Sequence, residues 1–269
     1  MNRRQLIASV GGAVLIWPRA GSAQAPEDRA RVLVDRILRM QAEAIAEKVD
    51  HFIKEVEGHL SWATGPVSGG GLELRRLDFL RLLRQVPEIT EVSYIDANGR
   101  EQIKTSRLAM DPLTSGADFG QDPKFTQARA NKRYVSPVYF RKESEPYITL
   151  AIAAARGDVT IAEVNLKVIQ DMVAATRVGD HGVAFVVDTR GRVIAHSDIG
   201  MLRRDFSDLA HVQAATLAGP IPAVQTIQDI NGRQVLATYA IVARPTLSVF
   251  VERPTFRVFV ELPVEEATK

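Results

Sequence analysis

The 269-residue chain contains no cysteine. That absence excludes disulfide bonds, thiolate metal sites and a cysteine nucleophile. Aromatic residues make up only 6% of the chain, and no charge dominates, with 34 Lys and Arg against 32 Asp and Glu. Three of the arginines lie in residues 1–25, which hold no acidic residue, so the rest of the chain is close to neutral. A near-neutral chain has no field that would concentrate it on nucleic acid.

The sequence motifs of common enzyme classes are also missing. No Gly-x-Ser-x-Gly elbow, phosphate-binding glycine-rich loop or Gly-x-Gly-x-x-Gly fingerprint occurs. His51 and His59 are eight residues apart on one expected helix, not at the four-residue spacing that lets two imidazoles share a metal. His196 and Asp198 stand where a strand is expected to end, and there a polar pair that shapes the turn is favoured over a catalytic role. We expect no catalytic residue, no metal and no cofactor.

The N-terminus has the three parts of a secretory signal peptide. Arg3 and Arg4 precede a mostly apolar run, residues 6–17, and a small-x-small site, Ala-Gln-Ala, follows at residues 23–25. The run is short of the ~20 residues that a membrane-spanning helix needs. We expect residues 1–25 to be a signal peptide, similar to the twin-arginine type, that directs the chain to the periplasm. The alternative is an uncleaved segment that anchors it to the inner membrane.

A long helix is expected over residues 27–62. No proline or glycine occurs between Pro26 and Gly58, and apolar residues recur at alternating spacings of four and three, which places them on one stripe. The stripe consists of Leu38, Ala42, Ile45, Val49, Phe52 and Val56. Such a helix is ~50 Å long, more than one small module needs. It is interpreted either as a stalk that spans two modules and pairs with a second chain, or as a helix packed on its own sheet.

Two hairpins repeat about 90 residues apart. Residues 92–100 and residues 184–192 each combine an apolar strand with Asp-x-x-Gly-Arg, and a second strand follows. The aspartate begins the turn and the glycine takes the position with positive φ. Asp96 and Asp188 are therefore interpreted as turn formers and not as acid–base residues. The duplication indicates two modules.

Each hairpin is followed by a helical stretch and three further strands. In the first module the helical stretch covers residues 116–131 and the strands 134–141, 147–155 and 159–166. In the second the helical part covers 205–217 and the strands 223–230, 233–242 and 247–252. The predicted fold class is α+β: a long N-terminal helix and two tandem modules, each an antiparallel five-stranded sheet with flanking helices. The predicted bounds are 63–167 and 168–255, with a C-terminal tail over 256–269.

This order resembles the double Cache sensor domains, PAS-like in fold, of bacterial histidine kinases, cyclases and chemoreceptors. The resemblance covers nearly all of the chain after the leader and is closest in residues 82–94, 138–147 and 187–196. It implies a non-enzymatic sensor with a membrane-distal first module and a membrane-proximal second one. Family members usually continue into a membrane helix and an output domain, whereas only residues 255–269 follow here. We expect a free-standing sensor that acts on a membrane histidine kinase or cyclase, or the sensor part of a split gene.

The resemblance also implies a ligand pocket in the distal module, between the sheet and the loop and helix that cover it. The candidate residues there are Lys124, Phe125, Arg129, Tyr139, Arg141, Tyr147, Thr149 and Asn165. The family's amino-acid-binding pattern is met only in part. Tyr139 matches, but Asn165 stands where the pattern has an Asp for the ligand's ammonium, and Asp122 stands where it has an Arg for the carboxylate.

Loss of both charged clamps argues against an ordinary α-amino acid as ligand. The basic side chains of Lys124, Arg129 and Arg141 suit a carboxylate or another small anion better. Two rival functions remain open: a scaffold that dimerises through the long helix and binds no ligand, and an exported hydrolase with an unrecognised site.

Overall fold

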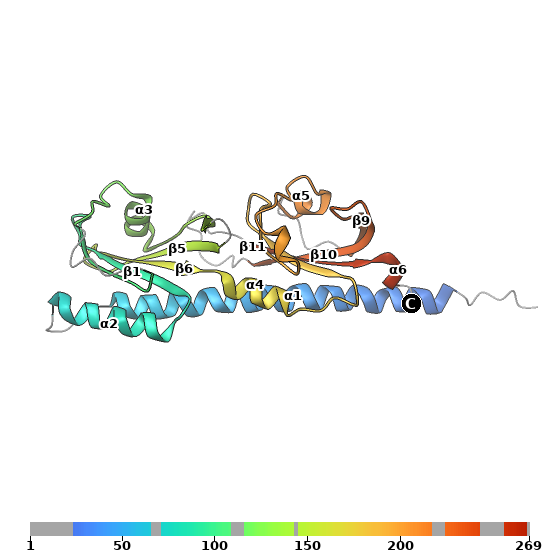
Figure 1. The fold of residues 1–269 in the computed structure, drawn as a ribbon, viewed down its shortest axis with the longest axis horizontal. Coiled ribbons are helices and arrows are strands. Elements are labelled where there is room, and N and C mark those ends of the chain that lie inside the picture. Colours follow the sequence, from blue (N-terminus) through green and yellow to red (C-terminus); the bar gives the residue numbers. More distant parts are fainter. Residues whose placement is uncertain are drawn as a thin grey trace, which may run out of the picture.

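The computed structural model describes residues 24–65, 71–108, 116–142, 145–216, 224–242 and 256–267. Two antiparallel sheets stand next to each other along one long helix, α1 (Gln24–Thr64) (Figure 1). The predicted α+β class is therefore confirmed. The proposed signal peptide lies almost entirely outside the described residues. None of the helices in the described ranges is long and apolar enough to cross a membrane.

Helix α1 carries the stripe that its sequence predicts. All six predicted stripe residues are buried, and Leu60 and Ala63 continue the stripe toward the C-terminal end. The first half of α1 contacts strands of the second module and the second half contacts strands of the first (Figure 1). One hydrophobic cluster accordingly includes the stripe and residues from both sheets. The helix spans both modules, so the interpretation that it packs on a single sheet is wrong.

The first module runs from α2 to β6. Its elements are α2 (Gly71–Gln85), β1 (Ile89–Ile95), β2 (Glu101–Ser106), α3 (Pro123–Asn131), β3 (Arg133–Val135), β4 (Tyr139–Arg141), β5 (Glu145–Ala153) and β6 (Val159–Asn165). The strand order is β2-β1-β6-β5-β3, and β4 also pairs with β5. One expected strand is thus divided into β3 and β4, since Pro137 has no N–H to donate to the ladder. The division gives this sheet six strands instead of five.

The helix α4 (Lys167–Ala174) connects the first module to the second. The elements that follow are β7 (Val183–Val187), β8 (Val193–His196), the short 3₁₀ turn η1 (Ile199–Met201), α5 (Ala210–Thr216), β9 (Gln225–Gln228), β10 (Gln234–Val242), β11 (Phe256–Pro263) and α6 (Val264–Ala267). The strand order is β8-β7-β11-β10-β9. In both modules α1 lies against one face of the sheet, and α3 or α5 lies over the other (Figure 1).

The prediction that residues 256–269 form a tail is wrong. Residues 256–263 are β11, the middle strand of the second sheet, which pairs with β10 and with β7. The strand expected at 247–252 lies outside the described residues. The sequence Val-Phe-Val-Glu-x-Pro occurs twice, at 249–254 and at 258–263. Because the second copy has nearly the same strand propensity as the first, the segment expected to be a tail carried the same strand signal as the predicted strand.

The duplicated turns have the chemistry that their sequence predicts. Asp96 accepts from the backbone amides two and four residues further on, and Asp188 does the same, at 2.9 and 3.0 Å in both turns. Gly99 and Gly191 take φ values of +82° and +81°. A third turn of this kind, which sequence reading missed, joins β9 to β10 and begins at Asp229.

Substitution of alanine for glycine should have opposite effects at two positions. In Gly191→Ala the new Cβ would lie 2.7 Å from the Cα of Ser207, at a positive φ, and should lower the free energy of unfolding by more than about 1 kcal/mol. In Gly58→Ala, on the exposed side of α1, the new Cβ meets no atom within 4 Å. This substitution should raise the free energy of unfolding by about 0.5–1 kcal/mol. Urea denaturation of both variants measures the difference. Equal effects at the two positions would contradict the assigned turn.

Candidate functional site

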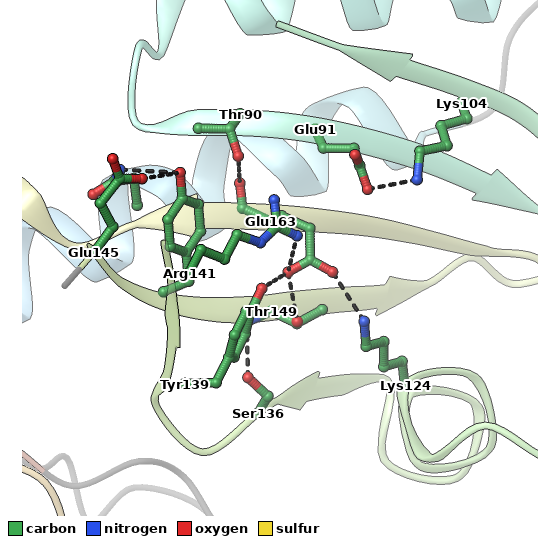
Figure 2. Close-up of polar contacts among 12 residues, drawn as sticks. Thr90, Glu91, Lys104, Lys124, Ser136, Tyr139, Arg141, Glu145, Thr149 and Glu163 are labelled. Carbon is green, nitrogen blue, oxygen red and sulfur yellow. Dashed lines mark hydrogen bonds and ion pairs between the residues drawn. The ribbon is translucent and has the colours of Figure 1, made fainter. Parts of the chain in front are cut away.

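A buried carboxylate, that of Glu163, is the centre of a polar cluster on the α3 side of the first sheet. The residue is 5% exposed. Lys124 Nζ donates to Oε1 at 2.9 Å, Thr149 Oγ1 donates to Oε2 at 2.8 Å, and the hydroxyl of Tyr139 also donates to Oε2 (Figure 2). Arg141 Nη2 lies 3.7 Å from Oε2. We call these five residues the Glu163 cluster.

Secondary structure brings the cluster together from four elements. Thr149 on β5 pairs directly with Glu163 on β6, so the two side chains share a face. Tyr139 and Arg141 are alternate residues of β4, so both point to that face, as predicted. Lys124 lies in the first turn of α3. This helix begins where Asp122 accepts from the Lys124 amide at 2.8 Å and Pro123 follows.

Two tyrosine rings border the cluster. Tyr139 and Tyr147 pair across β4 and β5 and stack with centroids 6.0 Å apart. The Arg141 guanidinium lies 4.7 Å from the centroid of the Tyr147 ring, a cation–π contact that holds it over the sheet. Asn165 Nδ2 donates to the Tyr147 hydroxyl at 3.1 Å. The two tyrosine rings and the loosely paired Arg141 guanidinium therefore lie together on the same face of the sheet.

The electrostatics of the cluster favour an ionised Glu163. Burial alone would raise the pKa of Glu163, but the Lys124 ammonium and the hydrogen bonds from Tyr139, Lys124 and Thr149 outweigh it and hold the pKa below its ordinary value. Burial and the neighbouring carboxylate raise the pKa of Tyr139, which stays a hydrogen-bond donor. Two cations, Lys124 and Arg141, thus surround one carboxylate, and the cluster keeps an excess positive charge.

A second acidic residue lies next to the Glu163 cluster on the neighbouring strand, and the two together form a polar strip across the sheet. Glu91 on β1 pairs directly with Glu163 on β6. Like charges opposite one another destabilise a sheet unless each has its own partner. Glu91 has one, because Lys104 Nζ lies 2.8 Å from its Oε1 (Figure 2). The strip therefore consists of two lysine–glutamate pairs.

The predicted ligand residues fall into two groups in the structure. Lys124, Tyr139, Arg141 and Thr149 meet at Glu163, and Tyr147 and Asn165 adjoin them. Two of the predicted residues do not join the cluster. Phe125 is buried in the apolar core beneath α3, and Arg129 lies over the Phe125 ring and donates to the Ala97 carbonyl at 3.3 Å. Their role as ligand contacts remains a prediction without geometric support.

Sequence reading missed Glu163 itself. A signal was present, because Glu163 precedes Asn165 by two residues on a strand that is apolar apart from these two and Thr160. Alternation puts both on one face. A charged residue in the interior of a buried strand needs a partner, and its position therefore indicates a polar site.

The histidine candidate of the second module has the structural role that was favoured. The Asp198 amide donates to His196 Nδ1 at 2.8 Å, and Asp198 in turn accepts from Gly200 at the start of η1. Burial lowers the pKa of His196. Within the described part of the chain, no group of three or more His, Asp or Glu could hold a metal ion.

Comparison with known proteins supplies the family and the fold. The model of the Cache domain family dCache_1 matches residues 23–269. A search of the curated proteins found no match. The chain is similar in structure to the ligand-binding domain of the Pseudomonas fluorescens chemoreceptor CtaA in complex with L-isoleucine. The TM-score is 0.61 at 15% identity, and the similarity covers 90% of this chain and 97% of that one.

Two further solved structures have the same fold. The ligand-binding domain of the Campylobacter jejuni chemoreceptor Tlp3, in complex with 4-methylisoleucine, has a TM-score of 0.66 at 14% identity, over 89% of this chain and 94% of that one. The ligand-binding domain of the Pseudomonas aeruginosa PAO1 amino acid chemoreceptor PctC, in complex with GABA, has a TM-score of 0.58 at 17% identity, over 86% and 99%.

The Glu163 cluster should make stability depend on pH. Because the folded pKa of Glu163 is lowered, its contribution is present above the pKa of the unfolded carboxyl and is lost as the pH falls through the folded pKa. Glu163→Gln should lower the free energy of unfolding by about 1–3 kcal/mol at pH 7 and by progressively less below about pH 4. Thermal denaturation from pH 3 to 8 measures the difference.

The control for that experiment is Asp171→Asn. The Asp171 side chain is exposed and pairs with Lys167 on the surface of α4. An exposed ion pair contributes little to stability, so the free energy of unfolding of this variant should stay within about 0.5 kcal/mol of that of the unaltered protein. A Glu163→Gln penalty that grew toward acid pH would contradict the assigned charge state.

Proposed function

The chain belongs to the Cache domain family, and we propose that it is an extracytoplasmic sensor whose first module binds a small organic ligand at the Glu163 cluster. The observation that carries this proposal is the convergence of Lys124, Tyr139, Arg141 and Thr149 on one buried carboxylate, beside two stacked rings. Small-molecule sites combine an apolar or aromatic wall with a few fixed polar groups in this way.

We propose that the ligand carries a carboxylate. Arg141 approaches Glu163 only at 3.7 Å, beyond hydrogen-bond distance, and its side chain is 31% exposed. A guanidinium held in place by an aromatic ring and not engaged by a bidentate partner is suited to a carboxylate ligand. The excess positive charge of the cluster favours the same class. Glu163 adds a contact for an ammonium group, which the sequence alone did not reveal.

The solved relatives lend support to a carboxylate ligand. L-Isoleucine and GABA, the ligands named for the CtaA and PctC domains, both carry a carboxylate and an ammonium group. We therefore consider two sources of the carboxylate, a simple organic acid and an amino acid. Glu163 distinguishes them, because only the amino acid gains from its negative charge.

We propose that ligand binding is transmitted to α1 and to the second module. Strands β5 and β6, which carry Thr149 and Glu163, pack against α1. The Val138 carbonyl, next to β4, accepts from Arg192 Nη2 at 2.8 Å, and Arg192 also pairs with the turn aspartate Asp188 of the second module. A shift of β4 on ligand binding would act on both contacts. A membrane histidine kinase or cyclase is the partner class that we propose for the output.

Isothermal titration calorimetry with GABA, butyrate and n-butylamine tests the ligand class. These compounds share a chain length and differ in their charged ends. We expect a compound with a carboxylate to bind and n-butylamine not to bind. Arg141→Gln should weaken binding by about tenfold or more, whereas Arg129→Gln, outside the cluster, should leave it unchanged. Binding of n-butylamine without either acid would overturn the proposal.

The variant Glu163→Gln separates the two sources in the same titration. It should weaken GABA and strengthen butyrate, because it removes a charge that attracts an ammonium and repels a carboxylate. Equal effects on both compounds would place the ligand away from Glu163.

A second copy of the chain is the partner that we propose for the N-terminal half of α1. Leu33, Ile37 and Met40 are 60%, 53% and 58% exposed. Their spacing of four and three puts them on one line, on the side of the helix away from the buried stripe. An apolar line of this spacing is typical of a helix that pairs with another helix.

Replacement of Ile37 by glutamate should abolish dimers while the fold persists. A buried charge in a helix pair costs several kcal/mol, whereas the same residue in water costs little. Multi-angle light scattering coupled to size-exclusion chromatography, with circular dichroism for the fold, measures both. Leu77→Glu, an exposed position on α2, is the matched control and should leave the mass unchanged. A monomeric unaltered protein would rule out this interface.

A further inference from the structure

Both modules carry a buried glutamate at the same place in the sheet. Glu163 on β6 pairs with the residue five positions before the turn aspartate Asp96. Glu261 on β11 pairs with the residue five positions before the turn aspartate Asp188. The strands β6 and β11 hold equivalent positions in their sheets. Each is the third strand in the order and pairs with the first strand of its module's hairpin, β1 or β7. The two glutamates therefore correspond in strand and in register.

The partner of each glutamate corresponds as well. Lys124 is the second residue of α3 and pairs with Glu163, and His211 is the second residue of α5 and lies 2.8 Å from Glu261, Nε2 to Oε1. Each covering helix thus places a basic side chain from its first turn over the glutamate of its own sheet. The duplication extends from the hairpins to a buried polar pair.

The two glutamates differ in how their oxygens are satisfied. Glu163 accepts hydrogen bonds from Lys124, Thr149 and Tyr139. Glu261 is 5% exposed, and its Oε1 has no hydrogen-bond donor among the described residues, since the contact with His211 is close but not aligned as a hydrogen bond. One cause lies on the adjacent strand. Ala237 of β10 pairs with Glu261 at the position where β5 has the hydroxyl of Thr149.

A cavity lies beside this carboxylate. Its volume is about 170 Å³, and Glu261, His196 and the rings of Phe185 and Phe206 are among the residues that line it. Phe185 and Phe206 meet edge to face with centroids 5.3 Å apart. An apolar cavity of about 150 Å³ holds a benzene molecule. This one is large enough for a ligand of comparable size.

The wall of the cavity is negative on balance. Asp229 also lines it but is matched by Arg233, whose Nε and Nη2 lie 2.8 Å from Oδ2. Asp198 accepts from the Gly200 amide at 2.8 Å. Burial lowers the pKa of His196, so that side chain is neutral at pH 7. His211 does not line the cavity. A buried carboxylate with one oxygen that has no aligned donor, next to aromatic faces, has the chemistry that recognises ammonium ions.

We propose that the second module has a binding site of its own, in which Glu261 holds a small organic ammonium ion against Phe185 and Phe206. The site is separate from the Glu163 cluster. Its ligand contacts the protein through a positive ammonium group, whereas the ligand proposed for the Glu163 cluster contacts it through a negative carboxylate. The proposal stands whether or not the first module binds a carboxylate.

Titration of the whole protein with trimethylammonium chloride tests the site. The uncharged control is tert-butanol, which has nearly the same shape, and sodium chloride controls for ionic strength. We expect saturable binding of one trimethylammonium ion per chain, measured by calorimetry and by a rise in thermal midpoint, and no binding of tert-butanol. Equal binding of the two compounds, or none of either, would overturn the proposal.

Three variants locate the bound ion. Glu261→Gln should weaken trimethylammonium binding by about tenfold or more. Ile230→Trp, at a half-exposed position on the wall, should abolish binding by filling the cavity without touching the buried pair, so the test holds even if Glu261→Gln fails to fold. Glu163→Gln distinguishes the modules. Loss of binding in that variant with retention in Glu261→Gln would assign the ion to the first module and refute the second site.

Discussion

The buried stripe of α1 is the constraint on which the rest of the structure depends. The strands of both sheets contribute to one core along this helix. Full burial of a large apolar side chain contributes about 1.5–3 kcal/mol, so loss of one such stripe residue removes a substantial part of the roughly 5–15 kcal/mol by which a domain is stable. A sheet fixed to α1 on one face is left with the other face for polar chemistry.

That division explains why a charged cluster is tolerated inside the first module. An isolated buried carboxylate would cost several kcal/mol. Glu163 is accepted because its partners come from three directions: from α3 above, from β5 alongside and from β4 at the edge. These elements are also the ones that a ligand would displace. In the proposed mode of binding, a molecule that competes for Arg141 or Lys124 changes how Glu163 is satisfied.

The local features that the sequence predicted correctly depend on residues close together in the chain, and the buried carboxylate that it missed depends on residues far apart in the chain. The α1 stripe and the Asp-x-x-Gly-Arg turns depend on neighbours within about four residues, and both were predicted correctly. Glu163 depends on a strand pairing and on a helix 39 residues away in the chain, which periodicity does not encode. Phe125 and Arg129 were selected for their chemistry, but the helical turn directs them to the core and to the hairpin. Residues 256–263 were assigned to a tail although they repeat the strand-like segment at 249–254, and that repeat was the signal for a strand.

The two modules show how one scaffold places two buried glutamates in different surroundings. Register, turn and covering helix fix where the glutamate and its basic partner stand, and these features are common to both modules. What differs is the adjacent strand, where Thr149 supplies a donor and Ala237 does not. Glu163 accepts from two hydroxyls, those of Thr149 and Tyr139, as well as from Lys124, whereas Glu261 Oε1 lies beside His211 without an aligned donor among the described residues. Strand pairing therefore fixes where each glutamate lies, and the residue on the neighbouring strand decides whether a hydroxyl is placed beside it.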